Sequence, residues 1–490
     1  MGKYALFLLE CRQLRFDRVF WAVTLTFLLA VLFGLANGQR WADEQNAQIN
    51  YFEQQSLDKY QNSRKQADEL RQHNAPAADN LAARNADPRY ALGFEGSNVQ
   101  HICRHSSAIA ALTVGQSDLY NACILVSAWA IGGGYDERLH RNLENPMRLL
   151  FGRFDTAFVM ITLLPIAILI LSYNQLSSER EQGTLSLLAC QPLAVRRIIA
   201  MRFMVRAVIF LLLLLLPLSL ALWSNTVSLN HATALNEYLV WLIATALYAL
   251  FWFACGFWVN ARSKSTAENG LLLAGLWLLL VVVLPGCLNL GLKQLYPVPS
   301  RMEFIDASRA ATIDVGKRKT ELLGKYLIDH PDRVKMTKQV NVDDFIQTRM
   351  AIDDETKRVL APGLTAFSAQ QQQQRNFVGR LRFLSPAIIY QQLTQLLTGQ
   401  GQDRQQAFLD ATDDYHHRLR AFYFPRFAQD SPDFSDYNGI PPFQDQPVTL
   451  SELWSKIISD YLGLSVPALL FAGVGWWRMR QVSIQMDDVR

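Results

Sequence analysis

Residues 156–173 read TAFVMITLLPIAILILSY, and this uninterrupted apolar run decides the fold class. A helix rises about 1.5 Å per residue, so a run of this length can cross a hydrocarbon core of about 30 Å. Five further runs of similar length occur along the chain. The sequence therefore predicts an all-α polytopic membrane protein with six transmembrane helices, at residues 19–37, 156–174, 203–224, 237–259, 269–291 and 457–477.

Two large polar inserts interrupt the membrane pattern, at residues 38–155 and 292–456. Residues 39–73 contain neither Gly nor Pro, so we expect the first transmembrane helix to continue outward. In the second insert, apolar residues recur three or four positions apart between Pro and Gly breaks, which is typical of several helices. Both inserts are predicted to be mainly helical. We interpret the Gln run at 370–374 as a solvated helix face, residues 430–447 as an irregular connector, and the short apolar run 122–131 as a buried helix or strand.

The placement of basic residues predicts the topology. Lys and Arg precede the first span, lie in the loops after the second and fourth, and follow the sixth, whereas residues 225–237 contain neither. Both termini and the loop 175–202 are therefore expected in the cytoplasm, and both inserts outside it. Residues 1–18 are expected to form an interfacial helix, with apolar residues at helical spacing, and 478–490 a cytoplasmic tail. The first span is long for a signal peptide, so we interpret it as an uncleaved anchor, with cleavage as the alternative.

Several function classes lack the residues that they need. No ionisable residue lies at mid-depth in a span, which disfavours a proton relay and an intramembrane protease. The string TIDVGKRKT at 312–320 lacks the upstream Gly of a phosphate-binding loop, so the chain is not expected to hydrolyse nucleotide. The net charge of +4 is too small to indicate a nucleic-acid partner. Prolines within spans free backbone carbonyls and form either hinges or fixed kinks: Pro165, Pro217, Pro285 and Pro467.

Cysteine and histidine residues gather in the first insert. Cys103 and Cys123 lie in the same predicted extracytoplasmic segment, where a disulfide between them can form. The string HICRH places His101 and His105 on either side of Cys103, and His140 follows later. A metal site there is conceivable, but no second cluster accompanies it, so we predict ordinary surface histidines and no bound metal.

The stretch SSEREQGTLSLLACQP, Ser177 to Pro192, follows the second span directly. Gly183 interrupts the helix leaving the membrane, Thr184 can cap a new one, and Leu185 and Leu188 fall on one face of it. A short charged helix with an apolar stripe fits a groove on a partner protein. The alternative is a polar connector whose leucines lie in the membrane interface.

The same stretch resembles the pattern that follows the second span in type-2 ABC export permeases. Residues 145–174 and 261–286, and the string YNGIPPFQ, are similar to the branch of that family with large periplasmic inserts, related to copper-enzyme maturation and gliding-motility permeases. The resemblance implies that a separate ABC ATPase subunit, which binds ATP and Mg²⁺, receives a coupling element formed by Glu179, Arg180, Glu181, Gly183, Thr184 and Leu185. It also implies a second permease chain, identical or paralogous, in a bacterial inner membrane. Arg153 and Asp155 match a Gly-Arg-Phe-Asp motif of the branch, and we expect them to form a local ion pair.

Three hypotheses follow. The first is the permease subunit of an ATP-driven exporter, or of a machine that acts on periplasmic or envelope partners through its inserts. The second is a non-transporting membrane anchor whose inserts bind envelope proteins. The third, a metal enzyme built on HICRH, has the least support.

Overall fold

The computed structural model describes residues 3–73, 100–115, 117, 120–128, 154–185, 194–223, 234–262, 265–297, 301–329, 345–427, 439–445 and 449–487. Six of the described helices are long and apolar enough to cross a membrane, and each of the six predicted segments falls on one of them. The predicted fold class, an all-α polytopic membrane protein, is therefore confirmed.

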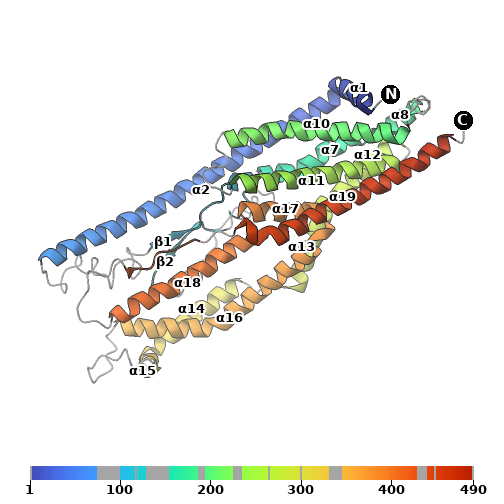
Figure 1. Cartoon of the computed structure of the whole chain (residues 1–490). Helices are drawn as coiled ribbons and strands as arrows, with labels where there is room; N and C mark the ends of the chain where they lie inside the picture. The colour runs from blue at the N-terminus through green and yellow to red at the C-terminus, as the bar shows by residue number, and fades with distance from the viewer. Residues whose placement is uncertain are drawn as a thin grey trace.

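The membrane-spanning helices lie side by side in an elongated molecule (Figure 1). The first span belongs to α2 (Arg18–His73), which continues beyond the span as one helix, as the sequence predicts. The second is built from α6 (Thr156–Phe158), η4 (Val159–Leu163) and α7 (Leu164–Ser172), the third is α10 (Val195–Trp223) and the fourth α11 (Ala234–Arg262). The fifth is α12 (Thr266–Trp277), η5 (Leu278–Val283) and α13 (Leu284–Leu295), and the sixth is α19 (Leu450–Asp487).

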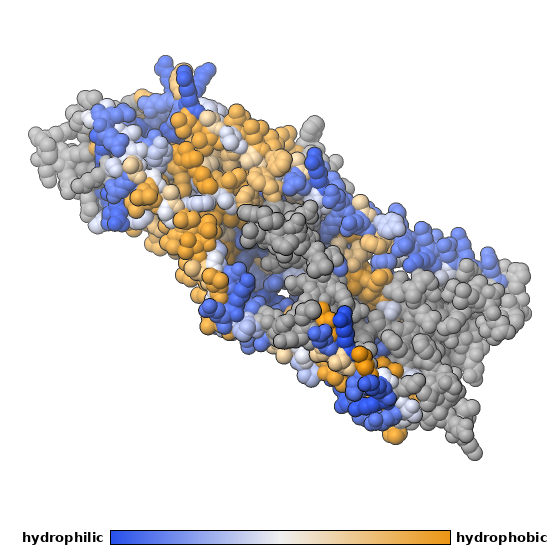
Figure 2. Space-filling view, turned by 180° about the vertical axis from the view of Figure 1, so that it is seen from behind, coloured by the Kyte–Doolittle hydropathy of each residue, from blue (hydrophilic) through white to orange (hydrophobic). Residues whose placement is uncertain are grey.

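The two ends of the molecule differ in content. One end carries α1 (Lys3–Arg15), the short helix α8 (Ser177–Glu181) and the C-terminal end of α19 (Figure 1). The other carries the insert helices α14 (Arg301–Lys317), α15 (Lys319–Asp329), α16 (Phe345–Leu381) and α18 (Gln402–Phe427). Figure 2 shows an apolar belt between hydrophilic surfaces, which is the pattern of a chain that crosses a membrane.

The fourth span forms the centre of the bundle. Helix α11 packs against α7 and α19 and buries Trp241, Tyr248 and Trp252 completely. Gly475 on α19 permits a close approach to α11, because a Cβ there would lie 2.8 Å from the ring of Phe257. By contrast, only 6% of the most apolar stretch of the fifth span is buried, against 61% for α11. The fifth span thus presents its apolar side chains outward.

Two spans carry the same local irregularity. In both, a π-helical segment, η4 or η5, ends directly before a Leu-Pro pair, at Pro165 and Pro285. Proline lacks a backbone N–H, so Pro165 and Pro285 each leave one carbonyl oxygen in the preceding turn without a backbone donor. The hydroxyl of Tyr248 donates to the carbonyl oxygen of Ile161 at 2.9 Å, and that of Ser385 donates to the carbonyl oxygen of Leu280 at 2.5 Å. The neighbouring elements therefore stabilise both irregular turns.

One helix of the second insert lies in the core of the bundle. Helix α17 (Pro386–Thr398) follows a short 3₁₀ turn, η7 (Arg382–Leu384), and is capped by Ser385. Its Tyr390 ring stacks on Tyr248 of α11 with centroids 4.8 Å apart, and its hydroxyl lies 2.9 Å from Thr245 Oγ1. Ile389, Leu393 and Leu397 join the same apolar cluster as the spans. Movement of the spans would therefore reach this insert directly.

The first insert is not helical throughout. Its described residues include an antiparallel pair of strands, β1 (Gln100–Cys103) and β2 (Cys123–Val126), and a 3₁₀ turn, η2 (Ala110–Leu112). Strand β2 lies in the apolar run that the sequence assigns to a buried helix or strand. Ile109, which precedes this turn, and Leu112, its last residue, join the membrane core cluster.

The predicted apolar stripe of the N-terminal helix is divided between two environments. Leu14 packs in the core cluster, whereas Tyr4 and Leu8 are 75% and 49% exposed. The exposed pair can enter lipid, as expected of an interfacial helix.

Candidate coupling site

The segment after the second span forms a tight, partly exposed bend. Helix α8 ends at Glu181, and Gly183 follows with a φ of +74°, a conformation that side chains with a Cβ rarely adopt. The hydroxyl of Thr184 donates back to the carbonyl and the carboxylate of Glu179, so it closes the bend. Glu181, Gln182 and Gly183 are exposed. These three residues form the tip of the segment.

Arg202 at the start of the third span holds the base of this bend. Its Nη1 donates to the carbonyl oxygen of Gln175 at 3.1 Å and to the carboxylate of Glu179 at 3.2 Å. Its Nε lies 3.4 Å from the carboxylate of Glu10 on α1, which is buried. Burial raises the pKa of Glu10, and the charge of Arg202 opposes this shift. One guanidinium thus ties α1, the end of span two and α8 together.

The tip is bonded to the first turn of the fifth span. The backbone N–H of Thr266 donates to Oε1 of Glu181 at 2.7 Å. The Thr266 hydroxyl lies 2.9 Å from both Oε2 of Glu181 and Oγ of Ser177. Glu181 therefore caps helix α12 from outside, beside Ser265, whose side chain accepts from the N–H of Glu268.

A buried amide network lies directly beneath the bend. The Nδ2 of Asn260 on α11 donates to the carbonyl oxygens of Ser172 and Gly256, each at 2.8 Å. Its Oδ1 accepts from the N–H of Leu176 at 3.1 Å and from Nδ2 of Asn269 at 3.3 Å. All four hydrogen-bonding positions of this amide are therefore used. Asn269 also donates to the carbonyl oxygen of Tyr173 at 2.8 Å, so the ends of spans two, four and five form one polar joint.

The two leucines of the sequence motif do not form part of the exposed tip. Leu185 is 8% exposed and belongs to the core cluster of the spans. Leu188 lies outside the described residues. Arg180 is half-buried, so within the described part of the motif a docking protein would meet Glu181, Gln182 and Gly183 first.

Asp155, expected in an ion pair, serves as a cap at the other end of span two. Its Oδ1 accepts from the N–H of Phe158 at 2.8 Å, and its Oδ2 accepts from the N–H of Val114 at 2.8 Å and the hydroxyl of Thr113 at 3.4 Å. These bonds attach the first insert to the N-terminal end of span two. Arg153 lies outside the described residues.

Cys103 and Cys123 are joined by a disulfide that links β1 to β2. His101 stacks on Phe52, and His105 lies 3.0 Å from the carboxylate of Glu53, so both rings contact α2. His140 lies outside the described residues. Among the residues described, no group of three or more His, Cys, Asp or Glu side chains could hold a metal ion.

Sequence reasoning did not single out Asn260, Asn269 or Thr266. The available signal was weak: two Asn residues nine positions apart, each close to the end of an apolar run. Polar side chains in or beside spans often bond neighbouring helices, but their partners cannot be read from spacing.

Comparison with known families agrees with this geometry. The sequence model of the family described as ABC-2 family transporter protein matches residues 4–476. The chain belongs to this family. It is thus a multi-pass permease subunit of an ABC transporter, the membrane component and not the ATPase, and it partners with an ABC ATPase subunit. No curated protein matches its sequence.

Proposed function

We propose that this permease subunit couples ATP hydrolysis by a separate ATPase subunit to movement of its spans and its extracytoplasmic inserts. The ATPase docks on the tip Glu181–Gly183, and ATP and Mg²⁺ are bound by that partner. The chain lies in a bacterial inner membrane with both termini in the cytoplasm, on the same side as the tip.

The observation that carries the proposal is the bonding of the tip to the first turn of span five, which a buried joint connects to spans two and four. Force on Glu181 acts on Thr266 and hence on the first turn of span five. The joint of Asn260 and Asn269 ties that turn to spans two and four. Because a buried hydrogen-bonded joint resists separation, displacement of the tip would move the three span ends together.

The outward-facing apolar surface of span five supports the presence of a second permease chain. This surface includes Leu271, Leu279, Val282 and Leu290. We propose that a second copy or a paralogue packs here and that the path opens between the two chains. The purpose of the movement is export, or mechanical work on a periplasmic or envelope partner.

The alternative is a non-transporting anchor whose inserts bind envelope proteins. The observation that favours it is the insertion of α17 among the spans, because this helix can convey movement to the inserts without any flux of substrate. Nucleotide-dependent movement of the inserts without transport would support the alternative over export.

Docking at the tip is tested by affinity purification from native membranes in mild detergent. The variant Gln182→Trp places a bulky side chain on the exposed tip, and Gln61→Trp places the same side chain on exposed α2 at the other end of the molecule. We expect an ATPase subunit to co-purify with the parent and with Gln61→Trp but not with Gln182→Trp. Equal recovery with both variants would contradict docking at the tip.

A further inference from the structure

A large cavity lies where the second insert meets the outer ends of the spans. Its volume is about 1290 Å³, and its walls come from α16, α17, α18 and the first turns of α19. Residues 105–108 of the first insert, Glu237 at the start of α11, Leu292 on α13 and Asp445 also line it. This volume exceeds the roughly 300–1,000 Å³ of pockets for drug-sized ligands. The cavity therefore has room for a segment of a polymer.

The charges around the cavity largely neutralise one another. Arg404 pairs with Asp445, Arg382 lies 2.8 Å from Asp460, and Lys456 lies 3.0 Å from Asp403. The described lining has four other Arg, Lys, Asp or Glu residues. Two are cations, Arg375 and Arg380, and two are anions, Glu237 and Asp410. A balanced lining of this kind selects neither an anion nor a cation.

Neutral amide side chains give the cavity its chemical character. Seven of them line it: Gln372, Gln374, Asn376, Gln392, Gln395, Gln402 and Gln406. Each amide has two N–H donors and an oxygen acceptor, the same groups that a main-chain peptide group uses. Gln372, Gln374 and Gln406 each use one N–H in a hydrogen bond within the protein, and each keeps a second N–H. None of the described residues that line this cavity is Phe, Tyr or Trp, the residues on which the flat faces of sugar rings commonly stack. The lining thus matches a polypeptide backbone better than a carbohydrate.

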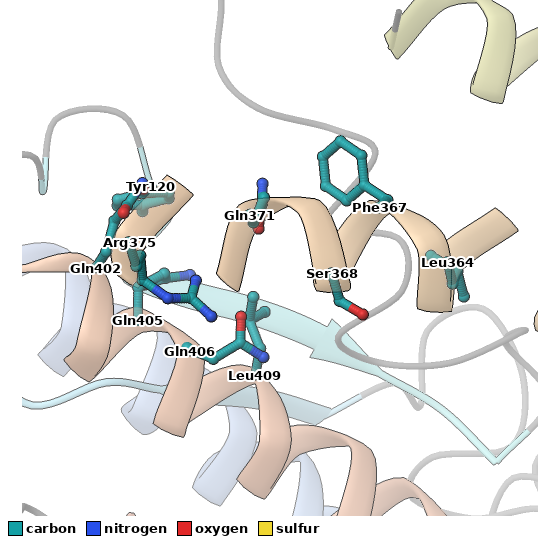
Figure 3. Close-up of a pocket in the computed structure, with 10 residues that line it drawn as sticks. All are labelled: Tyr120, Leu364, Phe367, Ser368, Gln371, Arg375, Gln402, Gln405, Gln406 and Leu409. Carbon is teal, nitrogen blue, oxygen red and sulfur yellow. The ribbon is translucent and has the colours of Figure 1, made fainter. Parts of the chain in front are cut away.

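A smaller pocket adjoins the cavity and shares Arg375, Gln402 and Gln406 with it (Figure 3). Gln405 lines this pocket and is only 3% exposed. Neither its Oε1 nor its Nε2 has a hydrogen-bond partner among the residues that the structure describes. Buried amides normally have partners, so this one offers a donor and an acceptor to a molecule that enters the pocket.

We propose that the cavity binds an extended segment of an extracytoplasmic polypeptide, with its amide side chains bonded to the main-chain peptide groups of that segment. Recognition of the main chain tolerates many sequences. This binding does not depend on docking of an ATPase, so it can succeed or fail independently of the coupling proposal.

The test uses the purified full-length chain in lipid nanodiscs, without an ATPase. The probe is a fluorescein-labelled mixture of peptides of Gln, Ser, Lys and Glu in random order. Each peptide has about 15 residues, which makes it several times larger than a drug-sized ligand. Anisotropy is expected to show saturable binding that neither maltoheptaose nor short-chain phosphatidylglycerol displaces. Displacement by maltoheptaose would instead indicate a carbohydrate site, and displacement by the lipid a headgroup site; either result would overturn the proposal.

Two variants connect the binding to this cavity. Gln392→Leu with Gln395→Leu removes two lining amides without changing charge, and should weaken binding at least about tenfold, which corresponds to about 1.4 kcal/mol. Gln391→Leu, an exposed neighbour outside the lining, should bind as the parent does.

Ala407→Trp fills the cavity without removing a polar group. It should abolish binding, while thermal unfolding confirms that the protein is folded. Absence of saturable binding to the parent, or unchanged affinity in both cavity variants, would contradict the proposal.

Discussion

The backbone N–H of Thr266 donates a 2.7 Å hydrogen bond to the carboxylate of Glu181, joining the exposed tip after span two to the first turn of span five. The two residues are 85 positions apart in the sequence. A force applied to the segment that contains Glu181 therefore has a direct route to span five.

Replacing Thr266 with Val removes the hydroxyl of this pair but keeps the backbone bond and the shape. The variant loses the two bonds of the hydroxyl, to Glu181 and to Ser177, and each contributes about 0.5–1.5 kcal/mol. We expect the ATPase subunit to bind and hydrolyse ATP as before, while less of the hydrolysis drives movement of the inserts. Thr365→Val is the control, because that hydroxyl donates only to its own helix, at the carbonyl oxygen of Pro362. Equal coupling in both variants would show that the hydroxyl has no part in transmission.

Replacing Asn260 with Leu should destabilise the joint between the ends of spans two, four and five. The change leaves the N–H of Leu176 and the carbonyl of Ser172 without their partner in a buried setting. We expect a loss of roughly 1–3 kcal/mol, measured by thermal unfolding in nanodiscs. Asn376→Leu on exposed α16 should leave the unfolding temperature nearly unchanged. A loss no larger than that of the control would mean that the joint does not hold the spans together.

Replacing Ser385 with Ala removes two interactions, the cap of α17 and the bond to the carbonyl of Leu280 in the π-helical turn. Ser265→Ala removes a helix cap alone, which costs about 1 kcal/mol. Ser385→Ala should therefore cost about 1–3 kcal/mol more, because the carbonyl of Leu280 loses its donor in the core. Comparable unfolding temperatures for the two variants would contradict a stabilising role for this bond.

The contact between His105 and α2 should respond to pH. The pKa of His105 is raised, chiefly by its hydrogen bond to Asp445 and further by Glu53, against burial and the charge of Arg404. A pKa that is higher in the folded than in the unfolded protein means that protonation of His105 stabilises the fold. This stabilisation is complete below pH 6.5, the pKa in the unfolded chain, and is lost as the pH rises through the pKa in the folded protein. Hydrogen exchange of residues 100–128, corrected for intrinsic rates, should be faster at about pH 8.5 than at about pH 5.5. His105→Gln should abolish this difference, and its persistence in that variant would assign it to another group.

Asp445 should lose its stabilising contribution at acidic pH, whereas His105 loses its contribution at alkaline pH. Burial alone would raise its pKa, but hydrogen bonds from His105 and Arg404 outweigh burial and hold the pKa at about 2. Its contribution is therefore present above the ordinary value of 3.8 and is lost as the pH falls from there towards 2. The stability of this region should thus be greatest between the two transitions.

Replacing both Cys103 and Cys123 with Ser should destabilise the first insert. The disulfide closes a loop with a sequence separation of 20 residues, and constraint of such a loop contributes about 3 kcal/mol. Cys287→Ser, at an exposed free cysteine, is the control. Thermal unfolding that is the same in the double variant and the control would contradict this contribution.

The sequence predicts the spans well because a membrane imposes a strong and local requirement. Twenty apolar residues must be contiguous to cross lipid, so the runs at 156–174 and 269–291 are visible without any knowledge of tertiary contacts. The helix break at Gly183 is likewise local, since Gly readily adopts positive φ.

The rest depends on contacts between residues far apart in the sequence. The apolar face of residues 386–398 predicts a helix, but not that Tyr390 would stack against Tyr248 inside the bundle. The motif around Leu185 predicts an apolar stripe, yet the structure buries Leu185 within its own chain. The bond from Ser385 to Leu280 meets a need created by Pro285, and the sequence shows the need but not the donor.

The central claim is that events at the tip reach the extracytoplasmic cavity through the bonded ends of the spans. Spin labels at Gln372 on α16 and Ser451 on α19, both exposed, report the width of the region around the cavity. Double electron–electron resonance on the complex with its co-purified ATPase should show different distance distributions with and without trapped nucleotide, and Thr266→Val should reduce that difference. Identical distributions in both nucleotide states, in a complex that hydrolyses ATP, would contradict the account.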